Sequence, residues 1–361
     1  MKPIVKLFSI LFISLILNSC DQKPTEEKVE YSPPNVILLI GDGMGLSQLS
    51  SAFYYGESKS NFARFKEVGL INTSSSSHKV TDSGAGATAF SCGVKTYNGA
   101  IGVNSDTISI PNIVEILSEK KYNTAVISTS AVTHATPACF YAHVKSRRMQ
   151  ENIAEQLIDS DIDFFAGGGT KYFSNRNDEK DLIKQLKENG FYVNIDTETQ
   201  RLNKDKKYGF LLADGGMPTM LESRDNFLPD YTKLALKYLD QDKESFFLMV
   251  EGSQIDWAGH DNDADYLIAE VLDFDKTVGV AMDFAEKNQN TLVIVLADHE
   301  TGGFTLAPNE GDYNEIKSEF ATSGHSATLI PVLAFGPGSE DFKGIYQNHE
   351  IFQKILAVVG K

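Results

Sequence analysis

Carboxylates and imidazoles follow three short apolar segments of this chain, at the points where each segment ends. They are Asp42, Glu251, Asp256, His260, Asp298 and His299. Aspartate after an apolar segment is an ordinary turn residue, so one such end would indicate little. Three ends with oxygen and nitrogen donors, and no candidate thiolate among them, predict a zinc site of the catalytic kind. Asp256 and His260 are four residues apart, which places both on one face if a helix begins there.

A serine lies at the predicted start of a helix that is rich in small residues. Asp82 and Ser83 follow Thr81 in a capping pattern, and mostly glycine and alanine come next. A helix that begins there points backbone N–H groups and the positive end of its dipole at a bound anion. A serine hydroxyl needs a base or a metal to remove its proton. By itself Ser83 is a helix-start serine, but beside a metal cluster it becomes a candidate nucleophile.

Two kinds of segment alternate along the chain and must position these side chains. Short apolar runs predict strands over residues 35–40, 123–128, 162–166, 246–250, 291–297 and 331–335. Helical spacing occurs over residues 113–120, 153–158, 182–187, 231–239 and 266–284. Continuous apolar strands that alternate with helices predict an α/β fold with a largely parallel sheet covered on both faces. Ligands of such sheets bind beyond the carboxyl ends of the strands, where the candidate side chains lie.

The chain is acidic, with a formal net charge of −16 over 361 residues. Nucleic-acid binding needs a basic footprint, so this class of partner is excluded. A small anionic substrate is compatible with the charge when metal ions reverse its sign locally.

The first nineteen residues have the pattern of an export signal. Lys2 and Lys6 precede an apolar run that is too short to span a hydrocarbon core of ~30 Å. Small residues then lead into Cys20, which resembles a bacterial lipoprotein cleavage site at which Cys20 is acylated. An ordinary signal that is cleaved nearby is the alternative. Residues 20–34 predict a solvated tether, and residues 35–361 are expected to form a single catalytic domain. The protein is therefore expected to be an envelope lipoprotein of the periplasm or outer membrane.

The nucleophile segment, residues 80–103, resembles that of the bacterial alkaline phosphatases. Six further motifs match in order: Gly-Asp-Gly at 41–43, His-Ala-Thr-Pro at 134–137, His-Val-Lys-Ser-Arg at 143–147, Glu251 to His260, Asp298-His299, and Gly-His-Ser at 324–326. The resemblance covers nearly the whole chain after the signal. One departure is Gly84, where the family usually has alanine; it lowers helix propensity by roughly 1 kcal/mol and leaves the hydroxyl in place.

This resemblance implies a three-layer α/β/α sandwich, two Zn²⁺, one Mg²⁺ and hydrolysis of small phosphate monoesters through a phosphoserine intermediate. Position by position, it assigns the first zinc to Asp256, His260 and His325, and the second to Asp42, Asp298 and His299 beside Ser83. It assigns magnesium to Asp42, Thr136 and Glu251. Arg147 matches the arginine that clamps the phosphoryl group, and Asp82 matches the partner that orients it. A homodimer is also implied.

Two further positions are similar to those of a subset close to cold-adapted bacterial enzymes. His134 and Trp257 stand where many bacterial relatives have aspartate and lysine. Aspartate supplies a charge and accepts hydrogen bonds from magnesium-bound water, whereas neutral imidazole does neither and can ligate zinc. Loss of the lysine removes a cation near the phosphate. The pair is therefore predicted to retune the third metal site and product release; simple packing of Trp257 is the alternative.

Other functions and other motifs compete with this interpretation. A phosphodiesterase or sulfatase-like hydrolase of the same superfamily, or a non-catalytic metal- or phosphate-binding lipoprotein, are the alternatives. The combination of Ser83 with Thr136, Glu251 and Arg147 favours monoesters, and no ligand is missing. The patterns interpreted as structural are His78, His143, His349, the acidic run 261–265 at a helix start, and surface insertions near 171–208 and 308–322. Cys92 and Cys139 are expected to be small buried apolar residues, and the sequence does not decide whether they pair.

Replacing Cys20 tests the predicted anchor. Wild-type protein is expected to partition into the detergent phase and Cys20→Ser into the aqueous phase, because several acyl chains hold a protein firmly where one binds marginally. Phase separation followed by immunoblotting measures the difference. Equal aqueous partitioning of both forms would leave only an ordinary secretion signal.

Overall fold

The computed structural model describes residues 33–194, 202–242 and 244–360. The predicted signal, Cys20 and nearly all of the predicted tether lie outside the described residues. Among the helices that are described, none combines the length and the apolar composition that crossing a bilayer requires.

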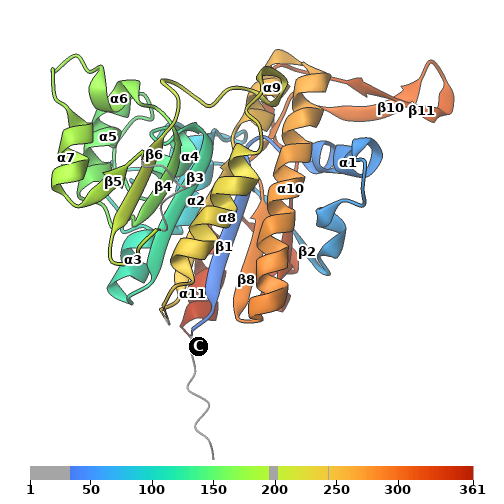
Figure 1. The fold of residues 1–361 in the computed structure, drawn as a ribbon. Helices are drawn as coiled ribbons and strands as arrows, with labels where there is room; N and C mark the ends of the chain where they lie inside the picture. Colours follow the sequence, from blue (N-terminus) through green and yellow to red (C-terminus); the bar gives the residue numbers. More distant parts are fainter. Residues whose placement is uncertain (1–32, 195–201, 243, 361) are drawn as a thin grey trace, which may run out of the picture. The chain divides into compact units, whose positions relative to one another are not determined.

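In the described part of the chain, ten strands form one sheet in the order β14-β2-β13-β8-β1-β7-β3-β4-β6-β5 (Figure 1). Their bounds are β1 Asn35–Gly41, β2 Glu67–Asn72, β3 Asn123–Ala131, β4 Phe164–Gly168, β5 Phe191–Val193, β6 Lys207–Leu211, β7 Phe246–Gly252, β8 Thr291–Leu296, β13 Ile330–Phe335 and β14 Gly344–Gln347. Neighbouring strands are parallel, except that β13 is antiparallel to both β2 and β8. The predicted, mainly parallel sheet is confirmed.

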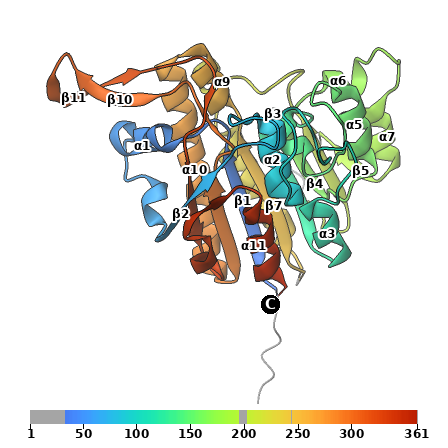
Figure 2. The same ribbon diagram turned by 180° about the vertical axis from the view of Figure 1, so that it is seen from behind.

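Helices cover both faces of this sheet. The long helices α8 (Phe227–Leu239) and α10 (Ala264–Asn288) lie on one face, and α2 (Ser83–Cys92) and α11 (Glu350–Val359) lie on the other (Figures 1 and 2). The remaining α-helices are α1 Leu46–Tyr55, α3 Ile113–Glu119, α4 Ala135–Ala138, α5 Gln150–Ile158, α6 Lys171–Ser174, α7 Leu182–Glu188 and α9 Gln254–Asp261. Short 3-10 turns are η1 Asn61–Arg64, η2 Met220–Glu222 and η3 Ser339–Phe342.

The middle of the sheet is the centre of the core. Every residue of β1, β7 and β8 is buried. Because helices cover both faces, both alternating sets of side chains must be apolar, which explains the continuous apolar runs in the sequence. Glu251, near the carboxyl end of β7, is the charged exception.

Within the ten-stranded sheet, the strands that the sequence did not predict lie at the two ends. They are β2 and β14 at one end and β5 and β6 at the other. β2, β5 and β14 each expose part of their residues, so their sequences lack a continuous apolar run. The stretch 171–208, expected to be an insertion, contributes α6, α7 and the edge strand β5.

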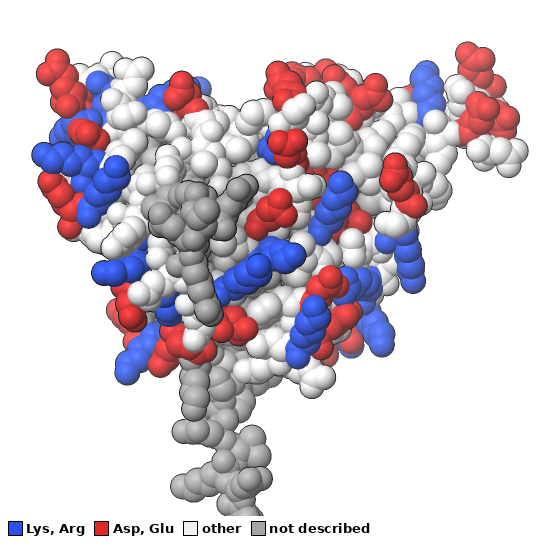
Figure 3. Space-filling view, viewed as in Figure 1, with Lys and Arg blue, Asp and Glu red and all other residues white. Residues whose placement is uncertain are grey.

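Two predicted surface features have defined structures. Residues 308–322 fall largely on the hairpin β10 (Thr305–Asn309) and β11 (Asp312–Glu319), which projects outward in Figure 1. The acidic run 261–265 is exposed between α9 and α10, where Figure 3 shows acidic side chains together. Its Asp263 carboxylate accepts the Tyr266 N–H at 3.0 Å and caps α10, so this run is a solvated helix start as predicted.

Candidate active site

Three neighbouring strands deliver the predicted side chains to one edge of the sheet. β1 lies between β7 and β8, and all three strands are parallel. Ile40 is in register with both Glu251 of β7 and Leu296 of β8, so the chain leaves these strands at one level. Asp42 therefore lies beside residues 298–299, which follow β8.

A glycine lets the turn after β1 approach α9. Gly43 has a left-handed backbone, with φ of +72°. A Cβ at this position would lie 2.8 Å from both Asp256 Cα and Thr301 Oγ1, so space and conformation both require glycine. The close approach brings Asp42 against the helix that carries Asp256.

The first group of donor atoms comprises Asp256, His260 and His325. The two imidazole Nε2 atoms lie 3.1 Å apart, and they lie 3.4 Å and 3.5 Å from Asp256 Oδ1. Nδ1 of His260 faces the Ser323 carbonyl at 2.7 Å, and Nδ1 of His325 faces the Thr81 carbonyl at 2.8 Å. A carbonyl only accepts, so in neutral rings each Nδ1 carries the proton and the two Nε2 lone pairs face each other. A cation between them removes the repulsion.

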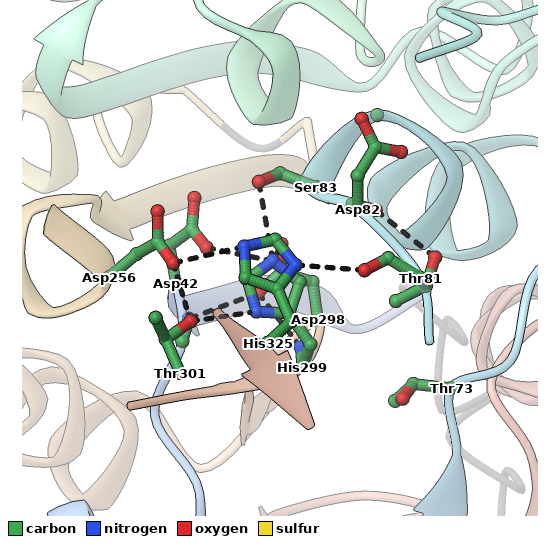
Figure 4. A network of polar contacts seen from close by, with 12 residues as sticks. Asp42, Thr73, Thr81, Asp82, Ser83, Asp256, Asp298, His299, Thr301 and His325 are labelled. Atoms are coloured by element: carbon green, nitrogen blue, oxygen red, sulfur yellow. Dashed lines mark hydrogen bonds and ion pairs between the residues drawn. The ribbon is translucent and has the colours of Figure 1, made fainter. Parts of the chain in front are cut away.

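The second group comprises Asp42, Asp298 and His299. His299 Nε2 lies 3.4 Å from Asp42 Oδ1, 3.3 Å from Asp298 Oδ2 and 3.4 Å from Ser83 Oγ. Thr301 Oγ1 donates its proton to a carboxylate of the first group, so at 3.2 Å it accepts the proton of His299 Nδ1. The lone pair of Nε2 therefore faces two carboxylates (Figure 4). Tetrahedral zinc places its donor atoms roughly 3.3 Å apart, which fits this spacing.

A third group shares Asp42. Donor atoms of Asp42, His134 and Glu251 lie within 4.8 Å of one another. Both carboxylate oxygens of Asp42, Glu251 Oε1 and Thr136 Oγ1 are buried without a hydrogen-bond partner. Buried oxygens without partners are costly, and a hard cation such as Mg²⁺ takes such oxygens as ligands.

Ser128 fixes which oxygen of Glu251 stays free. Its Oγ accepts the Ser130 N–H at 2.9 Å, lies 2.8 Å from Ser253 Oγ and donates its own proton to Glu251 Oε2. Ser128 was not predicted from the sequence, although a polar run at the end of an apolar strand was an available signal. Thr301, which links the first and second groups two residues after His299, was not predicted either.

Burial disfavours the charged forms of the carboxyls and of the His299 imidazole in the second and third groups. Desolvation raises the pKa of Glu251 to about 7, that of Asp298 to about 6 and that of Asp42 well above its ordinary value. It also lowers the pKa of His299 to about 3. A bound cation opposes the shifts of the carboxylates and favours unprotonated imidazole, so this chemistry fits a metal centre.

Ser83 is the first residue of α2 and Asp82 is its N-cap. The Asp82 carboxylate accepts the N–H of Ala85 at 3.0 Å and that of Gly99 at 2.8 Å. A Cβ on Gly84 would lie 2.8 Å from the carbonyl oxygen of the residue after Gly99. The glycine that replaces the usual alanine therefore lets this loop close against Asp82.

Arg147 connects the serine to the third group. Its Nη1 lies 3.0 Å from Asp82 Oδ2 and 3.5 Å from Ser83 Oγ, and its Nη2 lies 3.0 Å from His134 Nε2. Burial alone would raise the pKa of Asp82, but the guanidinium and two backbone N–H groups lower it overall. Burial would likewise lower the pKa of Arg147, and Asp82 more than offsets this. The pair therefore stays charged beside the serine.

The residues interpreted as structural lie outside these groups. Within the described residues, His78, His143 and His349 belong to no candidate metal group. His143 is hydrogen-bonded through both ring nitrogens, at 2.7 Å to a backbone carbonyl and at 3.0 Å to a carboxylate. Cys92 and Cys139 are both free and buried, so the prediction of buried thiols is confirmed.

Comparison with known proteins identifies the family. Residues 34–316 match the family model for alkaline phosphatase. The chain is 40% identical to alkaline phosphatase 3 of Bacillus subtilis, over 98% of its own length and 96% of that relative. It belongs to the alkaline phosphatase family. The Escherichia coli alkaline phosphatase is 30% identical over 90% of this chain and 86% of its own.

A solved structure agrees with this assignment. The alkaline phosphatase of the Antarctic bacterium TAB5 is 55% identical, with a TM-score of 0.88 over 91% of this chain and 98% of that one. The predicted family, three-layer fold and enzyme class, a phosphomonoesterase, are confirmed. Alkaline phosphatases are metal-dependent and act on phosphate monoesters, in agreement with the groups of donor atoms around Ser83.

Replacing Arg147 tests its predicted contact with phosphate. Arg147→Ala is expected to weaken inhibition by inorganic phosphate and to raise KM, because the planar fork binds oxygens present in both ground and transition states. The adjacent, exposed Arg148 supplies the control, and Arg148→Ala should change neither value. Steady-state kinetics with added phosphate measure both. Unchanged inhibition in folded, metal-loaded Arg147→Ala would refute the assignment.

Proposed function

We propose that this alkaline phosphatase hydrolyses small phosphate monoesters with Ser83 as its nucleophile. The arrangement around the hydroxyl carries this proposal. Ser83 Oγ lies 3.4 Å from His299 Nε2 and 3.5 Å from Arg147 Nη1. A group that can hold a cation and a group that binds phosphate oxygens thus flank one hydroxyl, at the positive end of α2.

The donor types support two zinc ions and one magnesium ion. Asp256, His260 and His325 would hold one zinc, and Asp42, Asp298 and His299 the other, since imidazole and carboxylate together suit zinc. Asp42, Thr136 and Glu251 offer only oxygens and would hold magnesium. When bound, such ions activate the attacking hydroxyl and neutralise charge on the phosphoryl and leaving oxygens.

The residues of the chain divide the reaction between them. Ser83 Oγ, having lost its proton to solvent, attacks phosphorus, and the bond from phosphorus to the alcohol oxygen breaks. This leaves a phosphoserine and an alcohol, which takes up a proton from solvent. Water then attacks the same phosphorus, and the bond to Ser83 breaks to release inorganic phosphate, while a proton from the water returns to the serine oxygen. Arg147 holds phosphoryl oxygens through both steps, and Asp82 keeps its fork oriented.

The hydrogen bonding of His134 supports a changed ion preference at the third group. Arg147 can only donate hydrogen bonds, so His134 Nε2 accepts a hydrogen bond from it. The neutral imidazole of His134 therefore carries its proton on Nδ1. Burial, then the nearby Arg147, lowers the pKa of His134 to about 3, which keeps the ring neutral. A donor N–H at the third group opposes a hard cation, whereas a carboxylate would favour it. For Nδ1 to ligate zinc, the hydrogen bond from Arg147 would have to break.

The cellular setting is proposed from the sequence. The signal pattern and Cys20 support export and a lipid anchor as the attachment to the membrane. The family resemblance supports a homodimer.

A rate comparison tests the proposed function. An aryl phosphate monoester should be hydrolysed orders of magnitude faster than the corresponding diester, and a chelator should abolish this activity. Ser83→Ala should lower monoester turnover by several orders of magnitude while zinc content, measured by elemental analysis, stays normal. A faster diester reaction would favour the phosphodiesterase alternative. Retention of more than about a tenth of the rate by Ser83→Ala would remove the serine from the mechanism.

The double substitution His134→Asp, Trp257→Lys tests the retuning. It should lower the inhibition constant for phosphate and make activity more responsive to added magnesium, because a carboxylate and a cation are restored. A structure of the TAB5 enzyme with one histidine replaced by aspartate has magnesium bound, which supports the direction. Titrations with phosphate and magnesium measure both effects. If neither value moves, the two residues only pack beside the site.

A further inference from the structure

A long connection between β6 and α8 crosses the carboxyl ends of the strands (Figure 1). This crossing segment comprises residues 212–226. Its Met217 N–H donates to the Thr129 carbonyl at 3.0 Å. The Gln254 side-chain amide donates to the carbonyls of Met217 at 2.7 Å and Thr129 at 3.0 Å. Thr129 belongs to β3 and Gln254 begins α9, so the segment is tied to two elements of the site.

A buried arginine ties down the other end of the crossing segment. The Arg224 side chain is completely buried against Glu270 and Asp273 of α10, which are also buried. Its Nη1 also donates to the Pro218 carbonyl at 3.2 Å, and Met220 N–H donates to Glu270 at 2.8 Å. Removing the guanidinium would leave two buried carboxylates unpaired. The crossing segment is therefore attached at both ends and has little freedom to move away from the site.

Gly216 lies between these attachments and against Trp257. A Cβ at Gly216 would lie 2.5 Å from Trp257 Cη2 and 2.9 Å from Cζ3. A real side chain cannot approach that closely, so the absence of a Cβ leaves the space that the half-buried indole occupies. Gly215, one residue earlier, is different: the nearest atom to its Cβ position is Lys171 Nζ, at 3.9 Å.

The indole in turn contacts the phosphate-binding arginine through one imidazole. Trp257 and His134 pack edge to face, with ring centroids 6.0 Å apart and an interplanar angle of 83°. His134 Nε2 accepts the hydrogen bond from Arg147 Nη2 at 3.0 Å. The contacts therefore run without a break from the crossing segment through the two rings to the guanidinium.

We propose that Gly216 is a positioning residue for the phosphate site. It seats Trp257 against the crossing segment, and this contact holds His134 where it orients Arg147. The proposal rests on the proposed role of Arg147 in binding phosphate. The crossing segment contributes no ligand to the three groups of donor atoms. According to this proposal, it instead determines how the phosphoryl group is bound, by fixing the position of the indole.

Two adjacent glycine substitutions separate this role from a general effect on the loop. Neither Gly215 nor Gly216 has a left-handed backbone, so alanine is tolerated by the conformation at both. Gly216→Ala should displace the indole and lower kcat/KM and phosphate affinity by about tenfold or more, since small misplacements of positioned groups are costly. Gly215→Ala should stay within about twofold of wild type, because its Cβ would make only an ordinary van der Waals contact with the end of the Lys171 side chain.

Trp257 is the only tryptophan, so its fluorescence reports the displacement directly. Gly216→Ala should shift the emission maximum of the folded, metal-loaded enzyme, and Gly215→Ala should not. This readout needs no turnover. If wild-type enzyme fails to hydrolyse monoesters, the proposed function fails while the difference in emission still tests the contact. Equal emission and equal phosphate inhibition in both variants would overturn the proposal.

A double-mutant cycle tests whether the effect passes through the indole. Phenylalanine lacks the outer ring atoms that an added Cβ would meet, so Trp257→Phe should relieve the contact. In a Trp257→Phe background, Gly216→Ala should change phosphate inhibition by no more than about twofold. If the full loss persists in that background, Gly216 acts through its backbone and the proposed contact is wrong.

Discussion

Mutual repulsion among buried donor atoms is the constraint on which this active site depends. Asp42, Glu251, Asp298 and His299 are completely buried at the ends of the central strands. Their lone pairs face one another, and desolvation raises the pKa of each of the three carboxyls. The strands behind them are fixed by a close-packed apolar core, so the groups cannot move apart to relieve the repulsion. Bound cations relieve it, which is why the fold and the metal requirement of the family belong together.

The three groups of donor atoms form one connected network. Asp42 belongs to both the second and third groups, and the Thr301 hydroxyl links the second group to the first. Arg147 then joins Ser83 to His134 at the third group. A change at one group therefore reaches the serine through one or two contacts. Effects of neighbouring substitutions in this network are not expected to add.

The rim of the site has a different physical character from its centre. At the centre, the side chains of the three donor groups have little freedom to change, since the oxygen and nitrogen atoms of each group face one another. The rim instead contains a ring pair, His134 and Trp257, and a glycine whose missing side chain makes room for the indole. The contacts at the rim therefore depend on the shapes of side chains, whereas those at the centre depend on charge and lone pairs.

The sequence by itself determined the types of donor and the strands that carry them. Helices cover both faces of β1, β7 and β8, so these strands had to be continuous apolar runs, and Asp42 and Asp298 had to follow their ends. The ordered motifs around Ser83 then predicted the family. Strands β2, β5 and β14, which lie at or next to the edges of the sheet, were missed because partly exposed strands have no such run.

Only the tertiary structure decided how the donors face one another. Ser83 and His299 are 216 positions apart in the chain, yet their side chains meet at 3.4 Å. The tautomers of His260 and His325 follow from backbone carbonyls of distant segments, and the free oxygen of Glu251 follows from the Ser128 hydroxyl. The contact between Gly216 and Trp257 has no sequence signal either. Such features depend on long-range packing, because local residue patterns specify the element but not its neighbours.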